Sequence, residues 1–293
     1  MKKLVIIFLC VFCSQQTFGQ LSDLARVEYT IIPRGNSNIE LTRKRALFNY
    51  PIKLKNDAFL LLGVDYSSID LAFEQDVPEF NQQEIEDFQL LDFNIGYTFK
   101  IDTDWRFGAR IVPGFSSNLR ARDLLLEDIV LSGDVVFIKD KKKSADVPKP
   151  YRLILGVSYS GNRGIRFPLP FISYYKKFHP KWSYNVGIPK SNLQYHWSQR
   201  FRLKLLAQLD GFNSNLQNRL EINNSTVAET IRQSLILGGL RFEYKFGEHL
   251  ELYLNSTYIF NKVFELEDDN RDRVFELDNG NDYFFKGGLR FKI

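Results

Sequence analysis

Apolar and polar residues alternate along most of this chain with a period of two, which is the period of an extended strand. In EHLELYLNSTYIFN, residues 248–261, the face that runs from Leu250 to Phe260 is mostly apolar, whereas Glu251, Asn255 and Thr257 lie on the other face. Similar runs recur near residues 24–32, 41–53, 58–72, 88–101, 104–117, 125–138, 151–160, 167–177, 182–188, 191–197, 200–213, 231–246, 249–262 and 283–293. No segment shows an apolar stripe at helical spacing between caps. The pattern predicts an all-β chain of about 14 strands, or about 12 if residues 182–197 form no hairpin.

The breaks between these runs fall into two classes that alternate along the chain. Short turns are predicted at residues 53–57, 101–105, 178–182, 198–201 and 246–250, and long loops at residues 74–87, 116–123, 213–230 and 265–282. Two breaks depart from this order, because 139–150 is long on the short-turn side and 188–191 is tight on the long-loop side. Short turns at one end and long loops at the other are typical of a transmembrane antiparallel up-and-down β-barrel.

Strand length and aromatic placement bear on whether the apolar face meets lipid or a second sheet. Many of the runs are 10 to 15 residues long, whereas strands of globular proteins average about five or six. Aromatic residues gather at the short-turn ends of the apolar faces: Trp105, Tyr151, Trp182, Tyr195 and Trp197. Such positions are typical of an interfacial girdle. We therefore expect the leucines of residues 250–254 to face lipid, with a soluble two-sheet sandwich as the alternative.

The N-terminus, MKKLVIIFLCVFCSQQTFGQ, has the pattern of a secretory signal peptide, with Lys2 and Lys3 before an apolar run and cleavage expected after Gly19. Residues 20–293 then form one barrel domain. Both cysteines, Cys10 and Cys13, lie in the removable segment, so the mature chain has no disulfide or thiolate metal site. Removal lowers Lys+Arg from 39 to 37 against 35 Asp+Glu, a net charge of +2 that indicates no polyanionic partner.

The C-terminal segment KGGLRFKI carries the most specific signal in the chain. Its polar, glycine, aromatic and hydrophobic positions are Lys286, Gly288, Phe291 and Ile293. In this the chain resembles outer-membrane β-barrel proteins, whose last strand is recognised by the barrel-assembly machinery, and it is similar to the uncharacterised barrel families of Gram-negative bacteria. The resemblance implies a location in the outer membrane, with outer-membrane lipids and the assembly machinery as partners. The chain departs from the usual pattern because it ends in Ile293 rather than in an aromatic residue.

The polar faces of the predicted strands carry charge, and more of it is basic than acidic. The candidate lumen-lining residues are Arg106, Arg110, Arg202, Lys204, Asp210, Arg241, Glu243, Lys245 and Glu251. One interpretation is a water-filled lumen whose positive charge favours small anionic or amphipathic solutes, so that the barrel is a passive, porin-like channel or binder. The alternative is an interior network of ion pairs that occludes the lumen, as in a structural or surface-interaction barrel.

Enzymatic readings have little support in the sequence. The three histidines, His179, His196 and His249, lie at or beside short turns, and strand geometry alone places no serine or carboxylate pair beside them. The acidic stretches at 74–87 and 265–282 lack the glycine-turned spacing of a calcium loop, so solvated loop charge is preferred to a metal site. Phosphate loops and nucleic-acid modules are also absent from the sequence. We expect no enzyme, cofactor, metal or nucleic-acid partner, and a lipid-modifying enzyme is the least favoured alternative.

Overall fold

The computed structural model describes residues 23–35, 38–121, 123–141, 148–165, 167–223 and 226–292. The predicted signal peptide, residues 1–19, and Ile293 therefore lie outside the described residues. The described chain contains 15 strands and two short 3₁₀ turns, Gln82–Ile85 and Leu126–Asp128. The strands are β1 (Ala25–Ile32), β2 (Ile39–Lys53), β3 (Phe59–Phe73), β4 (Asp87–Lys100), β5 (Trp105–Ser117), β6 (Ile129–Asp140), β7 (Tyr151–Tyr159), β8 (Leu169–His179), β9 (Trp182–Ile188), β10 (Lys190–His196), β11 (Phe201–Ile222), β12 (Thr226–Phe246), β13 (Leu250–Glu267), β14 (Arg273–Asp278) and β15 (Tyr283–Phe291).

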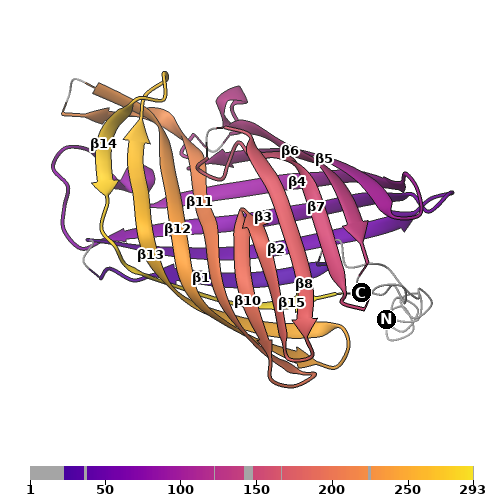
Figure 1. The fold of residues 1–293 in the computed structure, drawn as a ribbon. Helices are drawn as coiled ribbons and strands as arrows, with labels where there is room; N and C mark the ends of the chain where they lie inside the picture. The colour runs from indigo at the N-terminus through magenta and orange to yellow at the C-terminus, as the bar shows by residue number, and fades with distance from the viewer. Residues whose placement is uncertain are drawn as a thin grey trace, which may run out of the picture.

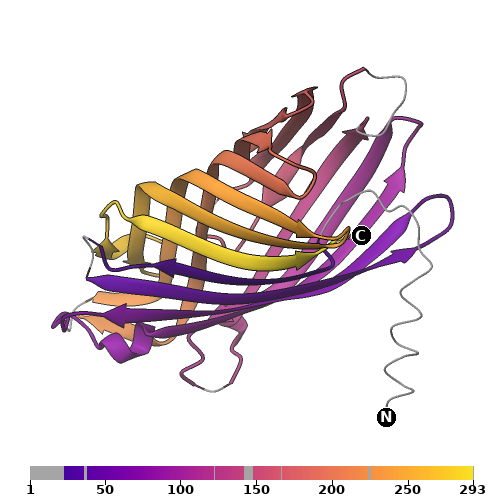
Figure 2. The same ribbon diagram turned by 90° about the horizontal axis from the view of Figure 1, so that it is seen from below.

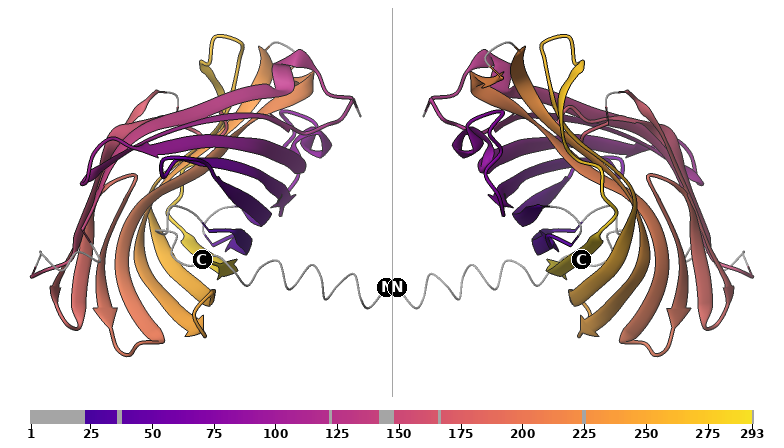
Figure 3. Two further views of the ribbon diagram at one scale, coloured as in Figure 1. Left: turned by 90° about the vertical axis from the view of Figure 1, so that its right-hand side faces the viewer. Right: turned by 90° about the vertical axis from the view of Figure 1, so that its left-hand side faces the viewer.

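The sheet closes on itself (Figure 1). Each strand from β1 to β13 pairs with the next in antiparallel fashion, and β15 pairs with both β13 and β1. Figures 2 and 3 show this closure, with yellow β15 beside indigo β1. The short strand β14 pairs only with the outer end of β13. The closed wall therefore has 14 strands, which confirms the predicted up-and-down barrel and its larger strand count.

The outer surface of the wall is a continuous apolar belt. Each of the 14 wall strands presents at least one large exposed apolar side chain: Val27, Phe48, Val64, Phe93, Ile111, Val135, Val157, Ile172, Val186, Leu193, Leu205, Leu240, Leu254 and Leu289. Soluble proteins rarely expose a contiguous apolar patch of more than a few hundred Å², so this belt is a lipid-facing surface. The outward leucines of β13 are part of it, and Trp182 and Trp197 are exposed at its short-turn edge.

Within the described residues, no helix is long and apolar enough to cross a membrane.

Most turn lengths follow the predicted alternation, and both predicted departures from it are present. The connection between β9 and β10 is the single residue Pro189, which follows a cis peptide bond. Two predicted loops are wrong, because 213–230 is mostly β11 and β12, and 265–282 includes the end of β13 and all of β14. These extensions lack a clean apolar alternation, since buried polar residues such as Ser214, Gln217 and Glu267 lie among their apolar ones.

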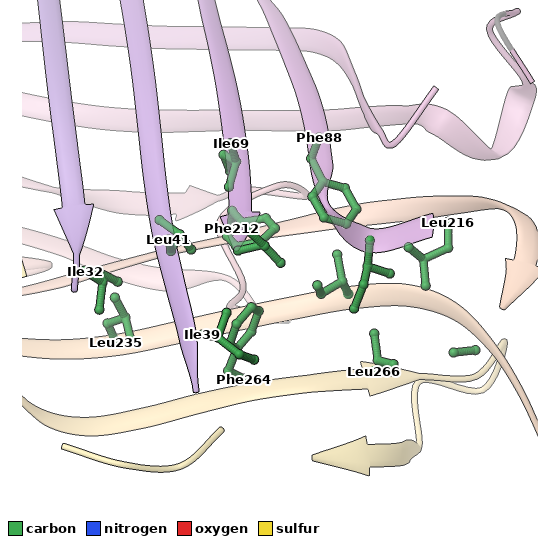
Figure 4. Close-up of a cluster of buried hydrophobic side chains, with 14 of the residues drawn as sticks. Ile32, Ile39, Leu41, Ile69, Phe88, Phe212, Leu216, Leu235, Phe264 and Leu266 are labelled. Atoms are coloured by element: carbon green, nitrogen blue, oxygen red, sulfur yellow. The ribbon is translucent and has the colours of Figure 1, made fainter. Parts of the chain in front are cut away.

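A packed apolar core fills the loop end of the barrel. Figure 4 shows side chains from β1 to β4 meeting side chains from β11 to β13 across the interior. Ile69, Phe88 and Phe212 are almost completely buried there, and the rings of Phe88 and Phe212 lie 5.8 Å apart between centroids. The two opposite walls are thus in direct contact at this end, whereas the core does not extend to the short-turn end.

Strand β11 brings the walls together. Its pairing with β10 ends at Gln208, and further along Asn215 pairs with Ser117 at the end of β5. Gly211 lies at the departure point with φ +151°, and a Cβ there would meet the Gln233 carbonyl oxygen at 2.2 Å. Only glycine fits this conformation and this contact. β11 therefore leaves β10 and crosses the interior to β5 while it stays paired with β12.

The second face of the crossing segment is polar, and its side-chain amides donate hydrogen bonds. Asn215 donates to Asp128 Oδ1 at 2.7 Å, and Gln217 donates to Asp128 Oδ2 at 2.6 Å. Asp128 itself is completely buried. Because a buried carboxylate is costly unless its oxygens are bonded, these amides fix β11 against the 3₁₀ turn before β6. Because Asn215 and Gln217 are polar, this part of β11 has no apolar alternation with a lipid-type face, and its sequence was predicted to be a loop.

Candidate functional site

Charged side chains gather on the inner wall near the short-turn end. They belong to four neighbouring strands, β11, β12, β13 and β15, whose register aligns Arg202 with Glu243 and Glu251 with Arg290. We call the group the basic cluster. Its members are Arg202, Lys204, Arg241, Glu243, Glu251, Arg290 and Lys292.

Glu243 is the centre of the basic cluster. Its side chain is completely buried, and four basic groups contact it. The nitrogen–oxygen distances are 2.7 Å for Arg202, 2.8 Å for Lys204, 2.8 Å for Arg241 and 2.9 Å for Arg290. A carboxylate in such a place is stable only because its neighbours compensate the lost hydration.

Glu251 is the second carboxylate of the cluster, one strand further round the wall. Arg202 reaches it at 2.5 Å and Lys292 at 3.3 Å, and the Nε of Arg290 donates to it at 2.7 Å. Arg202 and Arg290 therefore each bridge both carboxylates. This sharing fixes the guanidinium planes across three strand pairings.

A buried tyrosine supports the cluster from the side. The Tyr253 ring lies beneath two guanidinium groups, with Arg241 at 4.0 Å and Arg290 at 5.3 Å from its centroid. Its hydroxyl donates to Glu28 on β1. Gly288 faces the ring, and a Cβ there would come within 2.6 Å of it. The glycine thus makes room for Tyr253, and cation–π contacts of this kind hold the arginines in place.

The charge of the cluster does not balance. Five basic side chains share two carboxylates, and Lys245 follows on the same inner face of β12, where no ion pair is found for it within the described residues. The basic side chains keep partial contact with solvent, with Arg202 at 18% and Lys204 at 13% exposed. A concave wall with excess positive charge at low local dielectric attracts and concentrates anions. The basic cluster therefore has the charge and exposure that suit the binding of an anion.

The predicted lumen-lining residues separate into two groups. Arg202, Lys204, Arg241, Glu243 and Glu251 come together in the cluster, with Lys245 beside it. Asp210 lies further along β11 and pairs with Lys286 at 2.7 Å. Arg106 and Arg110 lie on β5, outside the cluster. Arg110 pairs with Asp134 at 2.6 Å, and Arg106 donates to the Asp57 carbonyl near the turn before β3.

Some inward residues of this region were not among the predicted site residues. Arg290 and Lys292 belong to the cluster, Tyr253 supports it, and Lys190 and Arg163 are further basic residues. Lys190 continues the two-residue period of the inward Asn192 and Gln194 on β10, so the sequence did contain a signal for it. Arg163 lies in the connection between β7 and β8, where no period exists.

The β7–β8 connection enters the interior where the lumen meets the core. The side chain of Asn162 donates to both carboxylate oxygens of Asp92, at 2.8 and 2.9 Å. The backbone N–H of Asn213 donates to the backbone carbonyl of Asn162. A polar cavity of about 30 Å³ remains beside Arg163 and Asp92, which is room for one or two waters. Together with the core, this segment occupies part of the interior of the barrel.

One expectation about the histidines is wrong. Ser183 Oγ lies 2.8 Å from His196 Nε2, across the β9–β10 pairing. Ser183 is completely buried, so a substrate cannot reach its hydroxyl in this conformation. No group of three or more potential metal ligands lies together in the part of the chain that the structure describes.

The barrel can be compared with proteins of known structure. A solved structure of the NanC porin has a TM-score of 0.39 and 11% identity, and the alignment covers 92% of this chain and 100% of that one. A deltaS2 mutant of the TodX monoaromatic hydrocarbon channel has a TM-score of 0.40 and 11% identity, and the alignment covers 92% of this chain and 90% of that one. The Pseudomonas putida toluene transporter TodX has a TM-score of 0.37 and 10% identity, and the alignment covers 92% of this chain and 87% of that one. No curated protein sequence matches the chain.

The family comparison covers most of the chain. The matching family model extends over residues 49–293, from the second half of β2 to the C-terminus, and so includes every member of the basic cluster. The chain belongs to the family described as a domain of unknown function, DUF6268.

Proposed function

We propose that this protein is an outer-membrane barrel that binds small anionic or amphipathic solutes in its lumen and serves as a passive channel for them. The observation that carries the proposal is the basic cluster, in which five cations share two carboxylates. A network built only to fill the barrel would approach neutrality, because each uncompensated buried charge costs stability. The proposal involves no catalysis and no cofactor.

The location rests on the exposed apolar belt, which needs lipid around it. We propose outer-membrane lipids as its partner and the barrel-assembly machinery as the factor that recognises Lys286, Gly288 and Phe291 with Ile293. The test is fractionation, together with migration on gels before and after boiling, since a closed barrel resists detergent until heated. Recovery as a soluble periplasmic protein would contradict the location.

The function is tested by planar-bilayer recording and by titration of the purified protein with inorganic phosphate. We expect phosphate binding that weakens with salt, because screening over a Debye length of about 8 Å at physiological ionic strength weakens exposed charge. Any current should be carried mainly by anions. Reversal of Arg202 and Lys204 to glutamate should abolish phosphate binding and shift the reversal potential toward cations.

The packed core favours a second candidate, a structural barrel with an occluded lumen, because the two walls meet at the loop end. That candidate expects neither current nor phosphate binding from a correctly folded barrel. The same two measurements therefore separate the two functions.

A further inference from the structure

Lys176 of β8 lies among three tyrosines near the short-turn end of the barrel. In the strand register, Tyr151 of β7 is its neighbour on one side and Tyr184 of β9 is its neighbour on the other. Tyr174 precedes Lys176 by two residues, so it lies on the same face of β8. We call Lys176, Tyr151, Tyr174 and Tyr184 the lysine–tyrosine site.

The tyrosine rings of this site contact one another. The centroid of the Tyr174 ring lies 6.4 Å from that of Tyr151 and 6.0 Å from that of Tyr184. Phe178 adds a fourth ring, 5.7 Å from Tyr184. Favourable aromatic pairs have centroid separations of about 4.5–7 Å. The lysine–tyrosine site is therefore a connected aromatic surface with one lysine among its rings.

The site lies on the lipid-facing side of the wall, close to the edge of the apolar belt. The two-residue period that places Lys176 outward also contains Ile172, and Ile172 and its cross-strand partner Leu155 are both exposed. Tyr184 lies two residues from Trp182, which is exposed at the short-turn edge of the belt. Two residues of a strand tilted by about 40° rise about 5 Å along the barrel axis. A long side chain such as Lys176 can reach the headgroup region from that depth.

Lys176 has no ion-pair or hydrogen-bond partner among the described residues. Other outward lysines do have partners, since Lys44 pairs with Asp70 at 3.4 Å and Lys139 pairs with Asp104 at 3.2 Å. Lys176 is half-buried, and an ammonium that has lost part of its hydration is stabilised by an anion beside it. The described wall supplies no carboxylate for this purpose.

Lysines are concentrated on this arc of the belt. The backbone N–H of Lys141 donates to the Tyr151 carbonyl at 3.0 Å, so Lys141 lies on the other side of Tyr151 from Lys176. Lys139 precedes it by two residues, and both contact Asp104. The outward positions at the same end of β11, β12, β13 and β15 are instead uncharged: Phe201, Tyr244, Phe246, Leu250 and Phe291. Positive charge therefore marks one side of the barrel at this depth.

We propose that the lysine–tyrosine site binds the phosphate group of an anionic phospholipid in the leaflet on the short-turn side. The Lys176 ammonium pairs with the phosphate, and the tyrosine hydroxyls donate hydrogen bonds to its oxygens. The acyl chains lie against the exposed Leu155, Ile172 and Val186.

Two observations select this occupant. The site is continuous with the lipid-facing belt, which selects a lipid. Lys176 and the neighbouring lysines attract an anionic headgroup and repel the cationic group of a zwitterionic one. The site lies on the outer face of the wall and uses no member of the basic cluster, so the inference does not depend on the proposed solute.

The test uses tryptophan fluorescence of the full barrel in phosphatidylcholine vesicles, because a brominated phospholipid quenches an indole beside it. Trp105→Phe and Trp197→Phe leave Trp182 as the single reporter. Brominated phosphatidylglycerol should bind beside it at least fivefold more tightly than brominated phosphatidylcholine, since one lysine near an anionic headgroup contributes about fivefold. A protein with all three tryptophans replaced by phenylalanine and with Tyr244→Trp reports on the uncharged side, where no preference is expected.

Lys176→Gln in the Trp182 reporter protein removes the charge and keeps the rings. The preference for phosphatidylglycerol should fall about fivefold, and the free energy of unfolding in phosphatidylcholine should stay unchanged because Lys176 has no protein partner. Lys181→Gln, in the exposed turn between β8 and β9, is the matched control and should leave the preference within twofold.

Two outcomes would overturn the lysine–tyrosine site. One is equal quenching of Trp182 by the two brominated lipids. The other is an equal loss of preference from Lys176→Gln and Lys181→Gln, which would show diffuse surface charge. Phosphate titration of the basic cluster is a separate measurement, so either outcome leaves the proposed function standing.

Discussion

The most informative single substitution is Glu243→Gln. It keeps the size and most of the hydrogen bonding of a completely buried side chain, but it removes the charge that Arg202, Lys204, Arg241 and Arg290 share. Removing one partner of a buried ion pair costs about 3–5 kcal/mol. Because the four cations retain 8–18% exposure toward the lumen, we expect a loss near the lower end, about 3 kcal/mol.

The assay is the free energy of unfolding in guanidinium chloride after folding into lipid vesicles, with and without inorganic phosphate. Phosphate should stabilise the variant more than the wild type, because it replaces the missing negative charge. A ligand at 100 times its Kd contributes about 2.7 kcal/mol, which is enough to offset most of the loss. Glu276→Gln is the control, since its pair with Arg273 is exposed and such pairs contribute only about 0–1 kcal/mol.

Two results would refute this reasoning. If Glu243→Gln and Glu276→Gln lose the same free energy, the four cations do not depend on the buried carboxylate. If Glu243→Gln is destabilised but phosphate stabilises it no more than the wild type, the cluster is a closed ion-pair network and not an anion site.

Three further perturbations test other parts of the barrel. Leu240→Arg, in the middle of the outward run of β12, should lower the unfolding free energy in vesicles by about 2–4 kcal/mol, and a neutral effect would place that face away from lipid. Phe212→Ala should cost about 3–5 kcal/mol and raise the single-channel conductance, whereas an unchanged current would show that the core is not the barrier. Lys141 and then Lys139 lower the pKa of Asp104 below its ordinary 3.8 in the turn before β5. The thermal-midpoint advantage of wild type over Asp104→Asn should therefore hold at neutral pH and shrink as the pH falls below 3.8.

The wall could be predicted from the sequence because each strand carries its own signal. Outward residues such as Leu205 and Leu254 face lipid over the full height of the band, so the two-residue period is strict there. The tight turn at Pro189 was also visible, as the exception that placed β9 and β10 in the count. Both features could be predicted because each depends only on residues that are close together in the sequence.

The interior was less predictable, because it depends on contacts between distant strands. Sequence parity placed Arg202 and Glu243 on the inside, but only the register brings Arg202 within reach of both Glu243 and Glu251. The crossing segment of β11 was mistaken for a loop because Asn215 and Gln217 alternate with Leu216 in a strand that has no lipid-facing side. Buried polar partners remove the contrast on which a period depends.

The contact between the walls at the loop end has one structural origin, the course of β11. The pairing of β11 with β10 ends at Gln208, because β10 begins at Lys190, and β11 then crosses to β5 while it stays paired with β12. Gly211 permits this bend, since a side chain there would strike the Gln233 carbonyl. The bend brings the opposite walls into contact at the loop end, whereas the core does not extend to the short-turn end. In a barrel built this way, the basic cluster is within reach of a solute that enters from the short-turn end.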